Sequence, residues 1–109
     1  MATNVTGERC ELTVTGDLDA HSADDLAAIG MLHLAEPAVQ SLAVDLAGVT
    51  FIDSAGLSAL VRMRNAAVAA GKELALRNPS PRVQRMLELT ALSGVFATDT
   101  PEGTGIADR

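Results

Sequence analysis

The segment LAVDLAGVTFIDSAGL, residues 42–57, decides the fold class of this chain of 109 residues. Residues 42–52 form a short apolar run of the kind that makes a strand covered on both faces. Over residues 54–70 apolar side chains recur at helical spacing, and Gly71 suits a helix end in the left-handed conformation. A buried strand that leads directly into a long helix is typical of an α/β sheet, and we expect this strand to be the central one.

The residues near the start of the chain predict one strand. Cys10, Leu12 and Val14 alternate with polar residues, which is the period of a half-buried strand, and Gly16-Asp17 ends it. We expect this strand to pair antiparallel at one side of the sheet. The residues before Glu8 are too few to predict another strand.

A helix follows that strand. The sequence Ser22-Ala23-Asp24-Asp25 fits a capping box, in which Ser22 caps the helix and Asp25 reaches back to it. The helix extends to about Leu34, because Glu36-Pro37 breaks the pattern. Its apolar face contains Leu26, Ile29 and Leu32.

The second half of the chain predicts a strand, a helix and a final strand. Residues 73–77 form the strand, and residues 78–81 form a turn in which Ser80 caps the next helix and a proline takes its first position. One face of that helix carries Val83, Met86, Leu87 and Thr90. Residues 95–97 can form a last short strand, and residues 101–109 lack apolar periodicity, so we expect a disordered tail.

Strands that alternate with helices favour parallel pairing through right-handed crossovers. We therefore predict an α/β fold with a mixed sheet of four to five strands. The later strands are parallel, and the helices pack mainly on one side. The domain covers residues 1–98, and a flexible C-terminal tail covers residues 99–109.

Composition excludes several classes of function. Because Cys10 is the only cysteine, the chain has no internal disulfide and no cysteine-based metal cage. A net charge of −6, two Phe and no Trp or Tyr argue against nucleic acid as a partner. No run approaches the roughly 20 apolar residues of a membrane span, and the start of the chain lacks the features of a signal peptide. We expect a cytoplasmic protein that does not insert into membranes.

Ser54 stands where the central strand passes into the longest helix. The edge of an α/β sheet is where partners bind, and the unpaired amides and dipole of the helix would hold an anion on Ser54. Gly56 would let a phosphate or another backbone come close, because it has no Cβ. The alternative interpretation is local: a Ser or Asp in front of a helix is usually only its N-cap.

A serine hydrolase is the catalytic alternative, with Ser54 as nucleophile and His21 or His33 as base. The nucleophile motif G-x-S-x-G requires glycine at position 52, where the chain has Ile52. His33 lies beside apolar helix positions, which is typical of a histidine in the core or at its rim. We therefore expect that this protein is not an enzyme and has no catalytic residues.

Five short blocks occur in a fixed order between about residues 10 and 96. They are Gly16-Asp17-Leu18-Asp19; Val44-Asp45-Leu46 with Val49; Phe51-Ile52-Asp53-Ser54-Ala55-Gly56-Leu57; Leu74-Ala75-Leu76; and Val83, Leu87, Leu92 and Val95-Phe96. In these blocks the chain resembles the STAS domain proteins, and in particular the bacterial anti-sigma factor antagonists.

The resemblance implies a protein that is switched by phosphorylation. An anti-sigma factor serine kinase would phosphorylate Ser54 with its own ATP and magnesium, so this chain would need no cofactor. The unphosphorylated chain would bind the anti-sigma factor and so release a sigma factor, and a serine phosphatase would restore that form. We expect the chain itself to be a monomer or a weak homodimer.

The expected partner-binding surface surrounds Ser54. Its members are Asp17, Asp19, His21, Asp53, Ala55, Gly56, Leu57, Ser58 and Arg62. Asp19 and Asp53 match family positions that flank the phosphoacceptor. A phosphate beside them would repel an acidic partner surface, so we predict an electrostatic and steric block with little change of fold.

Two features depart from the family pattern. Ala55 stands where many relatives have a second serine, and the end of the chain lacks the closing helix that many relatives have. Other STAS domains are non-phosphorylated interaction subunits of membrane transport complexes, or bind nucleotides or lipids. These functions remain the alternatives to the phosphorylation switch.

Overall fold

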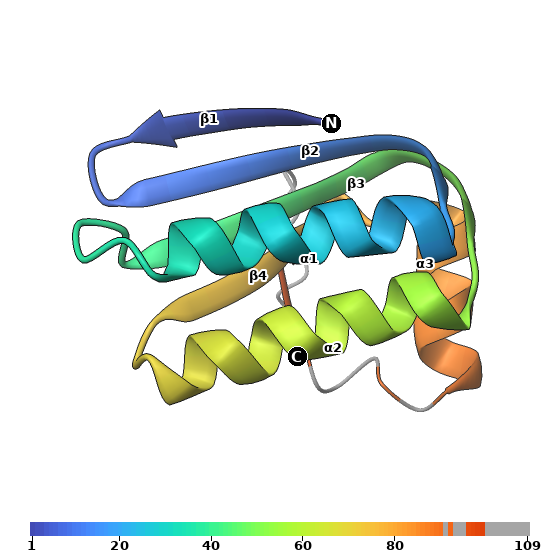
Figure 1. Cartoon of the computed structure of the whole chain (residues 1–109). Coiled ribbons are helices and arrows are strands. Elements are labelled where there is room, and N and C mark those ends of the chain that lie inside the picture. The colour runs from blue at the N-terminus through green and yellow to red at the C-terminus, as the bar shows by residue number, and fades with distance from the viewer. Residues whose placement is uncertain (91, 93–95, 100–109) are drawn as a thin grey trace.

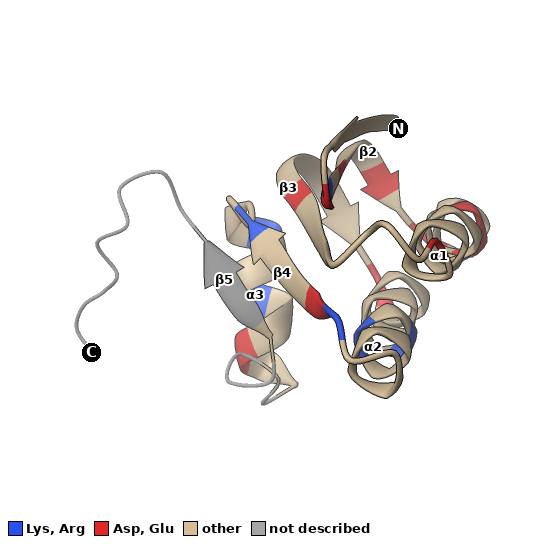
Figure 2. Ribbon diagram, turned by 90° about the vertical axis from the view of Figure 1, so that its left-hand side faces the viewer, with Lys and Arg blue, Asp and Glu red and all other residues tan. Residues whose placement is uncertain are grey.

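The computed structural model of this chain describes residues 1–90, 92 and 96–99. Within these residues a five-stranded sheet in the order β1-β2-β3-β4-β5 is combined with three helices, as predicted (Figure 1). The elements in chain order are β1 (Ala2–Thr6), β2 (Arg9–Leu18), α1 (Ala20–Leu34), β3 (Ser41–Ile52), α2 (Ser54–Ala69), β4 (Glu73–Arg77), α3 (Pro81–Leu89) and β5 (Ala97–Asp99). α1 and α2 lie next to each other on one face of the sheet (Figure 2).

The first strand differs from the prediction. Residues 2–6 do form a strand, β1, which pairs antiparallel with β2 across a turn at Gly7, whose φ is +61°. β2, which we expected at one side of the sheet, is an internal strand: it pairs antiparallel with β1 and parallel with β3. It also continues past Gly16-Asp17 to Leu18, and its pairing with β3 shifts register around Gly16.

β3 is the central strand, as predicted, but only one of its faces is covered along its first half. Leu42, Val44 and Leu46 are buried, whereas Ala43 and Asp45 between them are only half-buried. Asp45 accepts hydrogen bonds from the Ala47 amide at 3.0 Å and from the side chain of Asn78 at 3.3 Å. Its role is therefore structural.

The face of the sheet that α1 and α2 leave uncovered carries polar side chains. Arg77 of β4 pairs with Glu11 of β2 across that face, over the intervening strand β3. In the register, Ala43 of β3 is opposite Glu11, and Asp45 is opposite Arg77. Glu11, Ala43 and Arg77 are among the residues that line a hollow of about 580 Å³ on this face. The first half of β3 is therefore buried on one face and half-exposed on the other, and is not covered on both faces as we expected.

The start of α1 also differs from the prediction. Asp19, not Ser22, is the N-cap, and Ser22 takes the third helical position and completes the capping box from there. On the face that we expected to be buried, Leu26 is fully buried and Ile29 half-buried, but Leu32 is 65% exposed. The helix ends near Leu34, as predicted.

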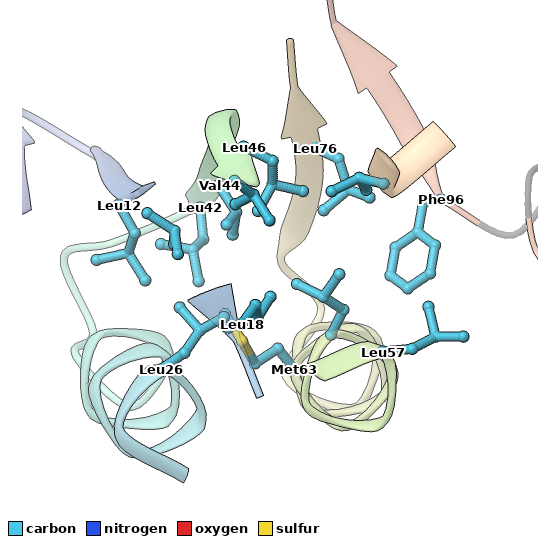
Figure 3. Packing of buried hydrophobic residues seen from close by; sticks show 14 of the residues in the cluster. Leu12, Leu18, Leu26, Leu42, Val44, Leu46, Leu57, Met63, Leu76 and Phe96 are labelled. Carbon is cyan, nitrogen blue, oxygen red and sulfur yellow. The ribbon is translucent and has the colours of Figure 1, made fainter. Parts of the chain in front are cut away.

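The core lies between β2, β3 and β4 and the two long helices. Figure 3 shows Leu26 of α1 and Met63 of α2 pointing toward Leu42 and Leu46 of β3. α3 starts as predicted, with Ser80 as N-cap, and its Val83 and Leu87 join the same cluster. These contacts fix where α2 begins relative to the end of β3.

The end of the chain is only partly described. The last strand is β5 at residues 97–99, two positions later than predicted. Gly94, Val95 and residues 100–109 lie outside the described residues, and most of the predicted tail falls there.

Candidate functional site

Both long helices begin at the same edge of the sheet, because β2 and β3 end together. The Asp53 amide donates a hydrogen bond to the Leu18 carbonyl at 3.3 Å, which ties the ends of the two parallel strands. Asp19 directly follows β2 and Asp53 directly follows β3, and each is the N-cap of the next helix. α1 and α2 pack against each other, so their positive ends lie side by side (Figure 1).

Asp53 provides the cap of α2. Its carboxylate accepts hydrogen bonds from the amides of Ala55 at 2.9 Å and Gly56 at 3.0 Å. The expectation that these amides would hold an anion on Ser54 is therefore wrong, since a carboxylate already occupies them. A phosphate on Ser54 would meet this negative charge instead.

Ser54 is the first residue of α2, and its side chain is exposed. The capping role falls to Asp53, so the two interpretations of this segment are compatible: one residue caps the helix and its neighbour presents a hydroxyl to solvent. Ser54 is thus accessible to a large partner at the edge where both helices start.

Asp19 lies in a matching cap at the start of α1. Its carboxylate accepts hydrogen bonds from the amides of His21 at 3.1 Å and Ser22 at 3.2 Å, and from the Ser22 hydroxyl. These bonds, the Ser22 amide first, hold the pKa of Asp19 below its ordinary value, because they favour the ionised form. Asp19 is therefore a fixed negative charge at neutral pH.

Asp17 and His21 extend this edge on the side of β2. Both are exposed, and the Asp17 carboxylate lies 3.4 Å from the Thr50 hydroxyl on β3. Phe51 is opposite Asp17 in the register and is 42% exposed. We expected Phe51 in the buried run of the central strand, so this exposed aromatic ring is a difference from the prediction.

Two residues expected on the partner-binding surface are buried. A Cβ on Gly56 would lie 2.4 Å from the Leu18 carbonyl oxygen, so the backbone that approaches Gly56 belongs to this chain. Leu57 is only 7% exposed and belongs to the core, where it lies near Phe96 (Figure 3). Both residues position α2, and neither presents a side chain to a partner.

The outer side of α2 carries the two polar residues of this helix that we expected on the partner-binding surface. Ser58 and Arg62 are exposed, and the Arg62 guanidinium lies 3.9 Å from the carboxylate of Asp24 on α1. Val68 on the same helix is 62% exposed. Ala55 is half-buried between the two helices.

Of the two histidines weighed as a base for Ser54, His21 lies in the first turn of α1, at the edge where α2 also begins. His33 lies in the last turn of α1, at the end of that helix away from Ser54. Among the described residues no group of three or more His, Cys, Asp or Glu side chains is arranged to hold a metal ion. In the same part of the chain, no helix has both the length and the apolar character needed to cross a membrane.

Comparison with known proteins gives consistent matches over nearly the whole chain. The family model described as "Mlab, STAS domain" matches residues 1–97. A protein of Lysinibacillus sphaericus named anti-sigma F factor antagonist is 29% identical over 103 residues, which cover 94% of this chain and 86% of that protein.

Solved structures share the same fold. The anti-sigma factor antagonist SpoIIAA in its unphosphorylated form superposes with a TM-score of 0.76 at 24% identity, over 93% of this chain and 90% of that one. The phosphorylated form of SpoIIAA superposes with a TM-score of 0.71 at 23% identity, over 93% of this chain and 94% of that one. A sulfate transporter family protein from Wolinella succinogenes superposes with a TM-score of 0.70 at 22% identity, over 91% of this chain and 83% of that one.

Proposed function

Because this chain belongs to the STAS domain family, we propose that it is an anti-sigma factor antagonist controlled by phosphorylation of Ser54. In its unmodified form it binds an anti-sigma factor that is also a serine kinase, and a sigma factor is released. The kinase supplies ATP and magnesium, and a serine phosphatase reverses the modification. The chain is thus a substrate and binding partner rather than an enzyme, and the cycle takes place in the cytoplasm. The name of the Lysinibacillus relative supports this role.

The observation that carries the proposal is the exposure of Ser54 at the first position of α2. Asp53 satisfies the amides of the first turn, so the Ser54 hydroxyl is not needed as a cap. A phosphate can therefore be added and removed without breaking a hydrogen bond of the helix. SpoIIAA, which has the same fold, has been solved in unphosphorylated and phosphorylated forms.

The charges around Ser54 support an electrostatic block. Phosphorylation adds about −1.5 to −2 charges at neutral pH, next to the Asp53 carboxylate and at the same edge as Asp19. Two like charges 4 Å apart repel by about 4 kcal/mol at an effective dielectric constant of 20, and salt reduces this. A remaining penalty of about 1.4 kcal/mol against an acidic partner surface weakens binding tenfold.

The exposed side chains near Ser54 define the proposed docking surface. They are Asp17 at the end of β2, His21 at the start of α1, and Ser58 and Arg62 on the outer side of α2, with Phe51 of β3 beside them. The half-buried Asp19 lies between Asp17 and His21 in the chain and completes the surface. Asp53 and Ala55 lie at its border. Gly56 and Leu57 support this surface from below, because both are buried.

The proposal is tested by phosphorylation in vitro with two matched variants. The full chain, Ser54→Ala and Ser58→Ala are incubated with purified anti-sigma factor serine kinase and Mg-ATP, and the modified residue is mapped by mass spectrometry. Ser58 is an exposed serine one turn further along α2, so Ser58→Ala controls for the loss of a nearby hydroxyl. We expect one phosphate on the wild type and on Ser58→Ala, and none on Ser54→Ala.

The phosphorylated chain is then tested for binding to the same kinase by calorimetry. We expect roughly tenfold weaker binding or more, from the electrostatic penalty above. Absence of label, label at another residue, or equal binding by both forms would contradict the switch. Binding that is tight and insensitive to phosphorylation would favour the alternative, a constitutive STAS interaction subunit.

A further inference from the structure

β1 forms an outer edge of the sheet that nothing in the described part of the chain covers. All five of its residues are exposed, and none of them is charged or a proline. The opposite edge, β5, is only three residues long. Proteins normally protect long edge strands with charges, prolines or bulges, because an unpaired edge is a template for another strand. β1 (Figure 1) has none of these protections.

The register shows which backbone groups of β1 are unpaired. Thr6 is opposite Arg9 across a two-residue turn, and the pair that closes such a turn exchanges two hydrogen bonds. Hydrogen-bonded pairs alternate along an antiparallel ladder, so Asn4 also bonds to β2. The amides and carbonyls of Thr3 and Val5 therefore point outward, toward a strand that would extend the sheet.

The side chains of the same two residues lie on the helix side of the sheet. Thr3 is opposite Leu12 and Val5 is opposite Cys10, and both of these β2 residues face the core. Val5 is 50% exposed and lies at a hollow of about 340 Å³ that Leu32, 65% exposed, also lines. A mostly apolar hollow, whose lining also includes His33 and Glu36, thus continues from the edge of the strand onto α1.

We propose that two copies of this chain associate by antiparallel pairing of β1 with β1 about a twofold axis. Thr3 of each copy lies opposite Val5 of the other, and the two sheets join into one of ten strands. This register brings Met1 of the second copy, 48% exposed, opposite Gly7 at the mouth of the hollow. A buried apolar side chain then supplements the backbone hydrogen bonds.

A second copy fits this edge because the pairing is self-complementary. The exposed groups of Thr3 and Val5 satisfy each other reciprocally under twofold symmetry, as an isologous interface requires. The chain carries a net charge of −6, which disfavours self-association in general, but the five residues of β1 are neutral. Pairing five residues buries a small area, so the dimer is weak.

The proposed interface is separate from Ser54. β1 pairs with residues 9–13, the first half of β2, whereas Ser54 lies at the edge where β2 ends at Leu18. The dimer therefore leaves the start of α2 accessible in both copies. Its test does not depend on the proposed function, since it uses neither kinase nor phosphate.

Sedimentation velocity over a series of concentrations tests the proposal with two double variants of the full chain. In Thr3→Lys/Val5→Lys, lysines lie opposite lysines, and we expect the dimer dissociation constant to rise about tenfold or more. In Thr3→Glu/Val5→Lys, each glutamate lies opposite a lysine, and association is retained. Both residues are exposed, and equal urea midpoints confirm that the variants fold.

Amide hydrogen exchange of the wild type provides an independent measurement. We expect the amides of Thr3 and Val5 to exchange more slowly as protein concentration rises, while the Asn4 amide, already paired with β2, does not change. A chain that remains monomeric at millimolar concentration would overturn the proposal. Association that survives Thr3→Lys/Val5→Lys, or that is lost in Thr3→Glu/Val5→Lys, would also refute it.

Discussion

Replacement of Gly56 by alanine tests how tightly the start of α2 is held against the sheet. A Cβ at this position would lie 2.4 Å from the Leu18 carbonyl oxygen, 2.9 Å from Leu18 Cγ and 3.0 Å from Ile52 Cγ1. The first contact involves backbone in the last residue of β2, which also accepts the Asp53 amide. Neither strand end can move away without breaking the hydrogen bond that joins them.

Two opposing effects determine the size of the change. Alanine in place of glycine within a helix gains about 1 kcal/mol of helix propensity. Overpacking costs about 1–3 kcal/mol, and contact with a fixed carbonyl oxygen places Gly56→Ala at the upper end. We expect a net loss of about 2 kcal/mol in unfolding free energy, which lowers the Tm by roughly 8–16 °C in a domain of this size.

Gly30 of α1 provides the matched control. It is also a buried helical glycine, and a Cβ there would lie 2.5 Å from an atom, but that atom is Cε at the flexible end of Met63. Because methionine adapts its side chain, Gly30→Ala should stay within about 1 kcal/mol of the wild type. Thermal and urea unfolding followed by circular dichroism measure both variants. A Gly56→Ala protein that is as stable as Gly30→Ala would refute the reasoning.

Substitutions at three further positions test the helix ends. Asp53→Ala removes the acceptor of two first-turn amides and should lower the unfolding free energy by about 1 kcal/mol. Asp53→Asn keeps a side-chain oxygen as the cap and should retain most of the stability that alanine loses. Urea unfolding measures both variants. Because the pKa of Asp19 is lowered in the folded chain, its carboxylate stabilises the fold at neutral pH, and this stabilisation is lost as the pH falls through the folded-state pKa, below 3.8. Asp19→Asn should therefore flatten the dependence of the urea midpoint on pH in the acid range. An Asp19→Asn protein whose urea midpoint falls with pH as steeply as that of the wild type would contradict this. Lys72 donates to the carbonyls of Leu34, the last residue of α1, and of Glu36, both at 2.7 Å. We therefore expect Lys72→Met to lower the unfolding free energy by about 1–2 kcal/mol by calorimetry, and Lys72→Arg to lower it less.

The elements whose sequence signals are local were predicted correctly. α2 and α3 have clear periodicity, and Gly71 and Ser80 mark an end and a start, with Gly71 at φ +70°. β1 was missed because its residues bury nothing, and its stability comes from pairing with β2. A strand of that kind leaves little pattern of its own in the sequence.

The errors around the candidate site have a common physical cause. Asp19 and Ser22 are both good caps three positions apart, and the buried Leu18 decides between them by fixing where β2 ends. Phe51 is exposed because the pairing of β2 with β3 shifts register before it. Tertiary pairing, which no single segment encodes, determined these details, while the position of Ser54 followed from its place after the central strand.

The caps of α1 and α2 have a consequence for the life of the protein in a cell. Asp19 and Asp53 occupy first-turn amides of both helices, so a phosphate on Ser54 neither supplies nor removes a backbone hydrogen bond. The two forms should therefore differ in stability only through the repulsion between the phosphate and the Asp53 carboxylate, which salt reduces. Proteases that act on unfolded chains would then degrade the phosphorylated form faster than the unmodified one. The ratio of the two forms in a cell would then depend on this difference in degradation as well as on the kinase and phosphatase activities.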